Sequence, residues 1–119
     1  MANLTIETHE NRSAYRPGES VEGIAGWELD GPAKWVEVRL FYQTAGKGDE
    51  DAAIVEVQRF DDPATTDAQV FRFAVPDGPY SYAGRLIELR WGLEVVAHRV
   101  KQTASLPIVL SPSGEALSA

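Results

Sequence analysis

The sequence predicts an all-β domain, a two-sheet antiparallel sandwich of about seven strands. The first observation is the segment 87–97, in which apolar residues alternate with charged or small ones. This period of two is typical of a strand with one face in a core and the other in water, and a strand of this length is expected to be central. The second observation is that six shorter segments alternate in the same way between turn-forming residues, and no segment has a convincing helical periodicity.

The first two strands are expected on either side of a tight turn. Residues 4–7 alternate and open the domain, and residues 20–29 form the next strand. Between them, Pro17 presets the φ angle of the second turn position and Gly18 supplies the positive φ of the third, which favours a type II turn. Gly23, inside the second strand, predicts that a large side chain of the facing sheet approaches closely there.

The remaining strands are expected at short intervals, over residues 34–44, 52–60, 68–75, 87–97 and 105–110. On the strand over 52–60, the residues Ala53, Val55 and Val57 are expected to share one face. Acidic clusters at residues 49–51 and 61–62 stand at the two ends of this strand, so it is expected at a solvated sheet edge.

The core is expected to contain the inward-facing residues of these strands. Two tryptophans, Trp27 and Trp91, have this orientation and are expected to be buried. The central strand contributes the largest set, which is Ile87, Leu89, Trp91, Leu93, Val95 and Ala97.

Composition indicates one soluble domain. At 119 residues, the chain is expected to form a sandwich over residues 1–110 and a flexible C-terminal tail over residues 111–119. The net charge of −7 opposes non-specific attraction to nucleic acid or to an anionic membrane surface. Without cysteine, no disulfide framework is expected. The N-terminus lacks the features of a signal peptide, and no apolar run approaches the ~18 residues that span a bilayer, so a cytoplasmic protein without membrane insertion is expected.

Three segments carry motifs that occur together in one known family. Residues 15–23, Tyr-Arg-Pro-Gly-Glu-Ser-Val-Glu-Gly, fit the pattern aromatic-x-Pro-Gly-Glu-x-Val-x-Gly. Residues 71–76, Phe-Arg-Phe-Ala-Val-Pro, and 79–84, Pro-Tyr-Ser-Tyr-Ala-Gly, are similar to Phe-x-Phe-x-Leu-Pro and Pro-x-Ser-aromatic-x-Gly, and the long strand follows them. In this order and spacing, the chain resembles the arrestin-like domain family. The positions that carry the resemblance are Pro17, Gly18, Glu19, Gly23, Pro76, Pro79, Ser81 and Gly84.

The resemblance implies an immunoglobulin-like sandwich that acts as a scaffold or adaptor rather than as an enzyme. The family includes arrestins, α-arrestins, the arrestin-like retromer subunit and bacterial sporulation-control proteins. Typical arrestins carry two such sandwiches in tandem, whereas this chain has length for one, which suggests that a second copy or another protein supplies the neighbour. The first strand carries Glu7 where arrestins use a Lys-Lys pair to sense phosphate, so recognition of phosphorylated receptors is not carried over.

No cluster of side chains points to catalysis or to a bound metal. His9 and His98 are the only histidines and are expected at the surface, because two ligands do not build a typical metal site. The acidic clusters match no ligand loop for calcium or magnesium and are expected to be solvated. Ser81 lacks a nucleophile motif and is expected to form a turn-stabilising hydrogen bond. We therefore predict no catalytic residue, no cofactor and no metal.

Charged residues on the outer strand faces are expected to form cross-strand ion pairs rather than a carboxylate pair of a hydrolase. These residues are Glu37, Arg39, Glu88, Arg90 and Glu94.

Outward-facing aromatic residues are the candidate partner-binding residues. Trp35 and Phe41 have outward orientation on their strand, and Ile24 has it on the preceding strand, so the three would form an exposed patch if these strands were neighbours. An equally weighted alternative is that Trp35 caps an end of the sandwich or lies under a loop. Tyr80 and Tyr82 form a second candidate, because loops carry binding residues and tyrosine is frequent at interfaces.

The function predicted from the sequence is that of a non-catalytic protein-interaction module, an adaptor or scaffold that binds a protein partner. Binding would use the aromatic patch or an edge strand that accepts a strand from another chain. The first alternative is a self-assembling structural homodimer. The second is a small hydrolase or a metal-dependent enzyme.

Overall fold

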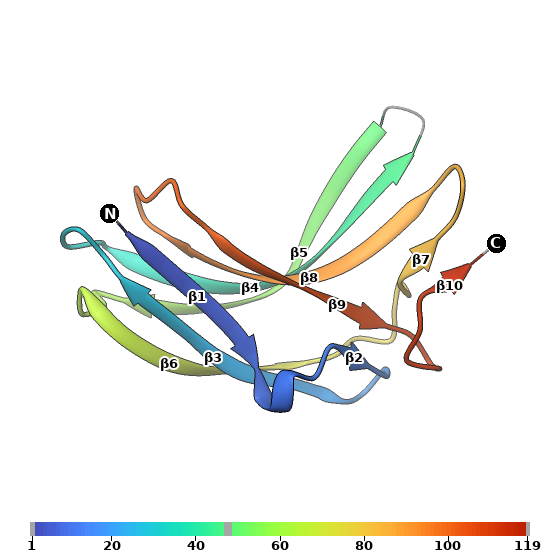
Figure 1. Ribbon diagram of the computed structural model, residues 1–119, viewed down its shortest axis with the longest axis horizontal. Coiled ribbons are helices and arrows are strands. Elements are labelled where there is room, and N and C mark those ends of the chain that lie inside the picture. Colours follow the sequence, from blue (N-terminus) through green and yellow to red (C-terminus); the bar gives the residue numbers. More distant parts are fainter. Residues whose placement is uncertain (1, 47–48, 119) are drawn as a thin grey trace.

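The computed structural model describes residues 2–46 and 49–118, which form strands β1 to β10 and one short 3₁₀ helix, η1 (Figure 1). The elements in order are β1 (Asn3–Thr8), η1 (His9–Asn11), β2 (Ala14–Tyr15), β3 (Ser20–Glu28), β4 (Trp35–Gly46), β5 (Asp49–Asp61), β6 (Thr66–Ala74), β7 (Tyr82–Ala83), β8 (Glu88–Ala97), β9 (Ala104–Leu110) and β10 (Leu117–Ser118). The seven expected strands are present, and β2, β7 and β10 are two-residue additions to them.

The strands form the two sheets of a β-sandwich, as predicted. A three-stranded antiparallel sheet has the order β1-β3-β6. A seven-stranded sheet has the order β10-β7-β8-β4-β5, with β9 also paired to β8 and β2 paired to β9. All long strands pair antiparallel, whereas the short pairs β2–β9 and β7–β10 are parallel. Figure 1 shows that the end of β4 and the starts of β5 and β8 extend beyond the three-stranded sheet.

The core lies between the sheets and contains both tryptophans that the sequence places there. The Trp91 side chain is 2% exposed, and its indole N–H donates to the carbonyl oxygen of Pro79 at 2.6 Å. The indole N–H of Trp27 donates to the carbonyl oxygen of Ala64 at 2.9 Å. These hydrogen bonds satisfy the one polar atom of each side chain, which lets the rest of the ring pack among apolar residues. Ile87, expected in the core, is exposed because it precedes β8, in the part of the chain beyond the three-stranded sheet.

The turn before β3 forms as predicted. Gly18 has a φ of +86°, and the N–H of Glu19 donates to the carbonyl oxygen of Arg16 at 3.1 Å, which closes the turn. Backbone hydrogen bonds from Gly18 to Val75 and from Val75 to Glu19 then fix the turn against the chain that leaves β6. The positive φ explains why glycine is needed at this position.

The side chain of Glu19 ties the turn to the segment before it. Its Oε1 accepts hydrogen bonds from the guanidinium of Arg12 and from the backbone N–H of Arg16, both at 2.6 Å. The hydrogen bond from Arg12, and next that from Arg16, hold the pKa of Glu19 below the ordinary glutamate value of 4.5.

We expect the stabilising effect of Glu19 to depend on pH. Because its folded-state pKa is lowered, its contribution is complete above pH 4.5 and is lost as the pH falls through the folded-state pKa. Thermal unfolding of wild type and Glu19→Gln between neutral and acidic pH should therefore show a difference in Tm above pH 4.5 that shrinks on acidification. A difference that does not change with pH would show that the charge of Glu19 contributes nothing to stability.

The close approach predicted at Gly23 is present, but it comes from the same sheet rather than from the facing one. A Cβ at this position would overlap the carbonyl oxygen of Glu7 on β1 and would lie 2.7 Å from the Phe71 ring on β6. Gly23 is therefore where the outer strands of the three-stranded sheet crowd the central one.

The edge strand β5 contains a β-bulge that the alternation did not reveal. Its pairing with β4 shifts between Leu40 and Phe41, and Val55 is the extra residue. A bulge reverses which residues face the core beyond it. Val55 and Val57, expected to share a face with Ala53, are instead both exposed. The position of β5 at a sheet edge is as expected.

Ser81 joins distant parts of the chain instead of stabilising its own turn. The buried hydroxyl accepts a hydrogen bond from the N–H of Leu110 at 2.9 Å, and the Ser81 N–H donates to the Leu110 carbonyl oxygen at 2.8 Å. In place of the free tail expected over residues 111–119, Leu117–Ser118 form β10 on β7, and the Leu117 N–H donates to the Ser81 carbonyl oxygen at 2.9 Å. Residue 119 lies outside the described residues.

Candidate functional site

An apolar row crosses the outer face of the seven-stranded sheet. The strand register places Pro107 of β9 opposite Gly92 of β8, Gly92 opposite Phe41 of β4, and Phe41 opposite Ile54 of β5. Directly opposite residues of antiparallel strands lie on the same face. We call these residues, Pro107, Gly92, Phe41 and Ile54, the apolar row.

Phe41 is held at the centre of this row. A Cβ on Gly92 would lie 2.7 Å from the Phe41 ring, so the ring packs directly on the glycine backbone. An aromatic ring fixed in this way loses little conformational entropy when another surface covers it. Beside it, Ile54 is 52% exposed and Val57 is 45% exposed. The row is thus a preformed apolar surface at a sheet edge.

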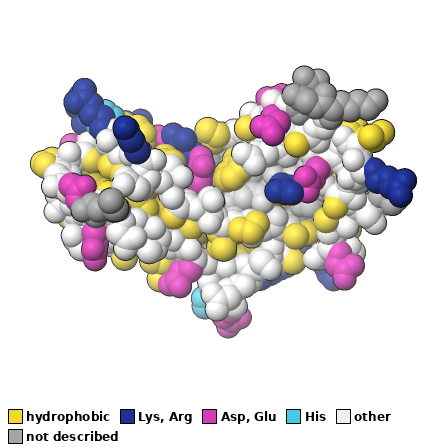
Figure 2. All heavy atoms as spheres, turned by 45° about the horizontal axis from the view of Figure 1, so that its top comes forward, with side chains coloured by type: hydrophobic (Ala, Val, Ile, Leu, Met, Phe, Trp, Pro, Cys, Tyr) yellow, Lys and Arg dark blue, Asp and Glu magenta, His cyan; other side chains and the backbone are white. Residues whose placement is uncertain are grey.

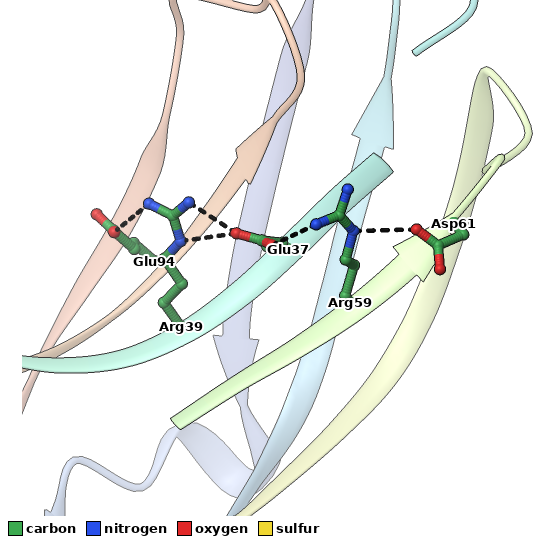
Figure 3. Close-up of polar contacts among 5 residues, drawn as sticks. All are labelled: Glu37, Arg39, Arg59, Asp61 and Glu94. Carbon is green, nitrogen blue, oxygen red and sulfur yellow. Dashed lines mark hydrogen bonds and ion pairs between the residues drawn. The ribbon is translucent and has the colours of Figure 1, made fainter. Parts of the chain in front are cut away.

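A ladder of charged side chains lies beside the apolar row, because the pair Arg39 and Glu94 is next to the pair Phe41 and Gly92 on the same face. Figure 3 shows the five members of the ladder, which are Glu94, Arg39, Glu37, Arg59 and Asp61. The Arg39 guanidinium is 3.5 Å from the Glu94 carboxylate of β8 and 2.7 Å from that of Glu37. The Arg59 guanidinium of β5 is 3.5 Å from the other oxygen of Glu37 and 3.0 Å from the Asp61 carboxylate. The cross-strand ion pairing predicted for this face is confirmed by the contacts between Arg39 and Glu94 and between Arg59 and Glu37.

The charges on both sides of the apolar row are compensated. On the side away from the ladder, the guanidinium of Arg90 lies 2.7 Å from the carboxylate of Glu88, which is a pair within one strand. Exposed pairs of this kind add little to stability. They do leave the apolar row bordered by polar groups with little net charge, which is the composition of a protein interface with an apolar centre and a polar rim.

Trp35 lies on the outer face of the same sheet, as its alternation predicts, but it is partly buried. Its ring centroid is 5.6 Å from that of His98 and 5.0 Å from the Arg59 guanidinium carbon. On β4, Glu37 and Arg39 of the ladder lie between Trp35 and Phe41 on the same face, so the two aromatic rings do not form one patch. His98, expected at the surface, is partly buried beside Trp35, whereas His9 is exposed.

Ile24 does not join these aromatic residues. The predicted patch required the strand of Ile24 to pair with that of Trp35, but β3 pairs with β1 and β6, whereas β4 pairs with β5 and β8. Ile24 is exposed on the outer face of the three-stranded sheet, opposite Val70. The two sheets turn their outer faces in opposite directions, so the prediction of a single patch is wrong.

Tyr80 and Tyr82 lie apart from the apolar row. Tyr80 is partly buried and packs against the core. Tyr82, in β7, is opposite Leu89 of β8, and its ring packs over Gly84, where a Cβ would be 2.6 Å from it. Their role in partner binding stays a prediction.

Three residues of the row, Gly92, Pro107 and Ile54, are not among the binding residues that the sequence predicts. Gly92 stands among the charged residues on the outward side of β8, and a glycine inside a strand is the signal for a close approach. No local signal places Pro107 and Ile54 in the row, because strand order and the bulge at Val55 decide the register.

The surface is acidic and has no features of a metal centre in the described range. Figure 2 shows acidic side chains scattered among hydrophobic ones on one face, without a continuous basic patch in view. Among the described residues, no group of three or more His, Asp or Glu side chains is arranged to hold a metal ion. A helix long and apolar enough to cross a membrane is absent from that same part of the chain.

Comparison with known proteins identifies the fold. The solved structure of Spo0M, a sporulation control protein from Bacillus subtilis, is similar to this chain with a TM-score of 0.66 and 15% sequence identity. The likeness covers 92% of this chain and 49% of Spo0M, so the chain spans about half the length of that protein. No protein-family model matches the chain, and no match is found among curated proteins. The fold is therefore arrestin-like, which confirms the fold expected from the motif positions.

Proposed function

We propose that this chain is a non-catalytic protein-interaction module, an adaptor that binds a partner protein through the apolar row. The observation that carries the proposal is the row itself, in which Phe41 is fixed on Gly92 and Ile54 is exposed at the edge. Apolar groups surrounded by paired charges suit a protein surface better than a small substrate, because this face contains no convergent set of reactive side chains among the described residues.

The arrestin-like fold supports the same proposal from a second direction. Spo0M is a sporulation control protein, and a regulatory or adaptor role for a chain of similar fold is consistent with that description. Fold similarity at 15% identity does not transfer a partner, so the binding surface has to be argued from this chain's own residues.

The proposal is tested by capture from the native lysate with single-charge variants. Ile54→Lys places a charge in the apolar row, and because Ile54 is half exposed the variant should keep its thermal stability within about 0.5 kcal/mol. We expect the captured partner, identified by mass spectrometry, to be lost with Ile54→Lys. The matched control is Leu86→Lys, which charges another exposed apolar residue, outside the row, and should retain the partner.

Light scattering on the purified protein separates a foreign partner from a second copy of the chain. If the wild type has the mass of a dimer and Ile54→Lys has that of a monomer, the apolar row binds a second copy of the chain, and the self-assembling homodimer replaces the adaptor as the function. Equal recovery of the partner by wild type, Ile54→Lys and Leu86→Lys would contradict the apolar row as the binding surface.

A further inference from the structure

A groove of about 730 Å³ lies on the outer face of the three-stranded sheet, away from the apolar row. Side chains of β3 and β6 form its floor, η1 closes one end, and Gln58 of β5 lies at the edge of β6. Its size is within the range of pockets that hold small ligands or short peptide segments.

Two apolar side chains are exposed in the groove. Ile24 and Val70 are opposite residues of β3 and β6, and they are 43% and 70% exposed. They form a small apolar surface that water covers in the isolated chain. Covering such a surface with another apolar group is favourable by about 25 cal/mol per Å².

Carboxylates surround this apolar surface. Glu7 is opposite Ile24 in the sheet register, and Glu10 and Glu22 also line the groove. The one guanidinium in the groove, that of Arg72, is 3.3 Å from the carboxylate of Glu22. Glu7 forms no ion pair or side-chain hydrogen bond within residues 2–46 and 49–118. His9 also lines the groove, and its Nε2 is 3.7 Å from the Glu10 carboxylate. Three carboxylates thus face one guanidinium and one imidazole, so the groove carries a net negative charge, and the Glu7 carboxylate is available to a ligand.

Glu10 lies at the rim of the groove because η1 has an unusual backbone conformation. Glu10 and Asn11 of η1 both have a φ of +56°, in the left-handed region that non-glycine residues seldom adopt. This turn lies directly after β1 and places the Glu10 carboxylate on the same groove as that of Glu7.

The edge of β6 beside the groove is closed to strand addition. The side-chain amide of Gln58 donates to the Val70 carbonyl oxygen at 3.2 Å, and its oxygen accepts from the Arg72 N–H at 3.4 Å. The Ala68 N–H donates to the carboxylate of Asp67 at 2.8 Å. Since side chains already satisfy these backbone groups, a ligand has to lie over the face of the sheet and bind through its own side chains.

We propose that this groove binds a short cationic segment of a partner polypeptide, with apolar side chains on Ile24 and Val70 and Lys or Arg side chains on Glu7 and Glu10. Charge complementarity selects this occupant, because the rim is acidic and the floor is apolar. A nucleic acid or an acidic peptide is repelled by the same carboxylates. The site is distinct from the apolar row and does not depend on it.

The proposal is tested with a labelled peptide of alternating lysine and valine, whose binding is followed by fluorescence anisotropy and by amide chemical shifts. We expect saturable binding that weakens as salt is raised, with shifts confined to β3, β6 and η1. Peptides of alternating glutamate and valine, and of lysine and serine, should bind at least about tenfold more weakly, because each lacks one of the two complementary features.

Variants locate the binding on the groove. Val70→Lys should lower the affinity for the lysine–valine peptide by at least about tenfold, because it places a like charge beside the ligand. Val70 is exposed, so the substitution does not disturb the core. Glu7→Gln should lower this affinity roughly two- to fivefold, as expected for one exposed ion pair. Ile54→Lys, in the apolar row, is the matched control and should bind the peptide as wild type does.

Two outcomes would overturn the proposal. One is a Val70→Lys variant that binds the lysine–valine peptide as tightly as wild type. The other is a concentration-dependent shift of the Ile24 and Val70 amides without peptide, because the groove would then be covered by a second copy of the chain. Neither outcome bears on the apolar row, whose test is the loss of a partner with Ile54→Lys.

Discussion

Replacing Trp91 with alanine is expected to lower the free energy of unfolding by about 3–5 kcal/mol, the usual cost of removing a large aromatic ring from a core. The side chain is 2% exposed, its ring centroid is 5.1 Å from that of Tyr42, and its indole N–H is bonded to Pro79. The variant loses these contacts and leaves the Pro79 carbonyl oxygen without its partner. Urea denaturation measures the change, and a fall in Tm of about 10–20 °C is expected for a domain of this size.

Two further variants help to interpret the loss of stability expected for Trp91→Ala. Trp91→Phe keeps most of the apolar ring and removes the N–H, so it should cost about 1–3 kcal/mol, the range for an unsatisfied buried polar group. Trp35→Ala removes a partly buried ring on the outer face and should cost clearly less than Trp91→Ala. A larger loss for Trp35→Ala than for Trp91→Ala would mean that the inward and outward faces of the sheet are assigned incorrectly.

The second large effect is expected from Gly23→Ala. The added methyl group would overlap the Glu7 carbonyl oxygen of β1, and the contact with the Phe71 ring adds to the crowding. Because a backbone atom cannot move aside as a flexible side chain does, we expect a loss at the upper end of the 1–3 kcal/mol that is typical of overpacking, about 3 kcal/mol. Hydrogen exchange should show the largest loss of protection in β1, which is displaced from β3.

Gly31→Ala is the control for this prediction. A methyl group added at Gly31 would have no other atom within 4 Å, and the residue has no positive φ, so the same substitution there should change stability by no more than about 0.5 kcal/mol. Equal stabilities of Gly23→Ala and Gly31→Ala would contradict the close approach of β1 and β3 at Gly23.

The alternation of the sequence predicted the orientation of most side chains correctly. Trp27, Trp91 and Phe71 are buried, and Phe41 and Ile24 lie on outer faces, as their positions in the alternation indicate. Orientation is local information, because successive side chains of a regular strand point to opposite sides whatever strands lie beside it. The alternation failed at Val57, where the bulge reverses the faces of β5.

The candidate binding surfaces were less predictable than the fold. Phe41 could be identified as an outward aromatic residue, but the other residues of the apolar row, Gly92, Pro107 and Ile54, come from three other strands. The groove likewise combines Glu7, Ile24 and Val70, which belong to three strands of the other sheet. Their spacing in the sequence does not indicate that these residues lie together in the fold.

By itself, the sequence determined the sandwich class, the turn at Pro17 and Gly18, the arrestin-like motif positions and the inward face of the central strand. These features depend on the alternation of residues, on the φ preferences of proline and glycine, and on the order of short motifs, all of which act over a few residues. Only the tertiary structure decided that β3 and β4 lie in different sheets, that Val55 forms a bulge, and that Ser81 is bonded to Leu110. The physical reason is that an alternating strand can pair equally well with many neighbours, so the choice among them rests on packing between segments far apart in the chain.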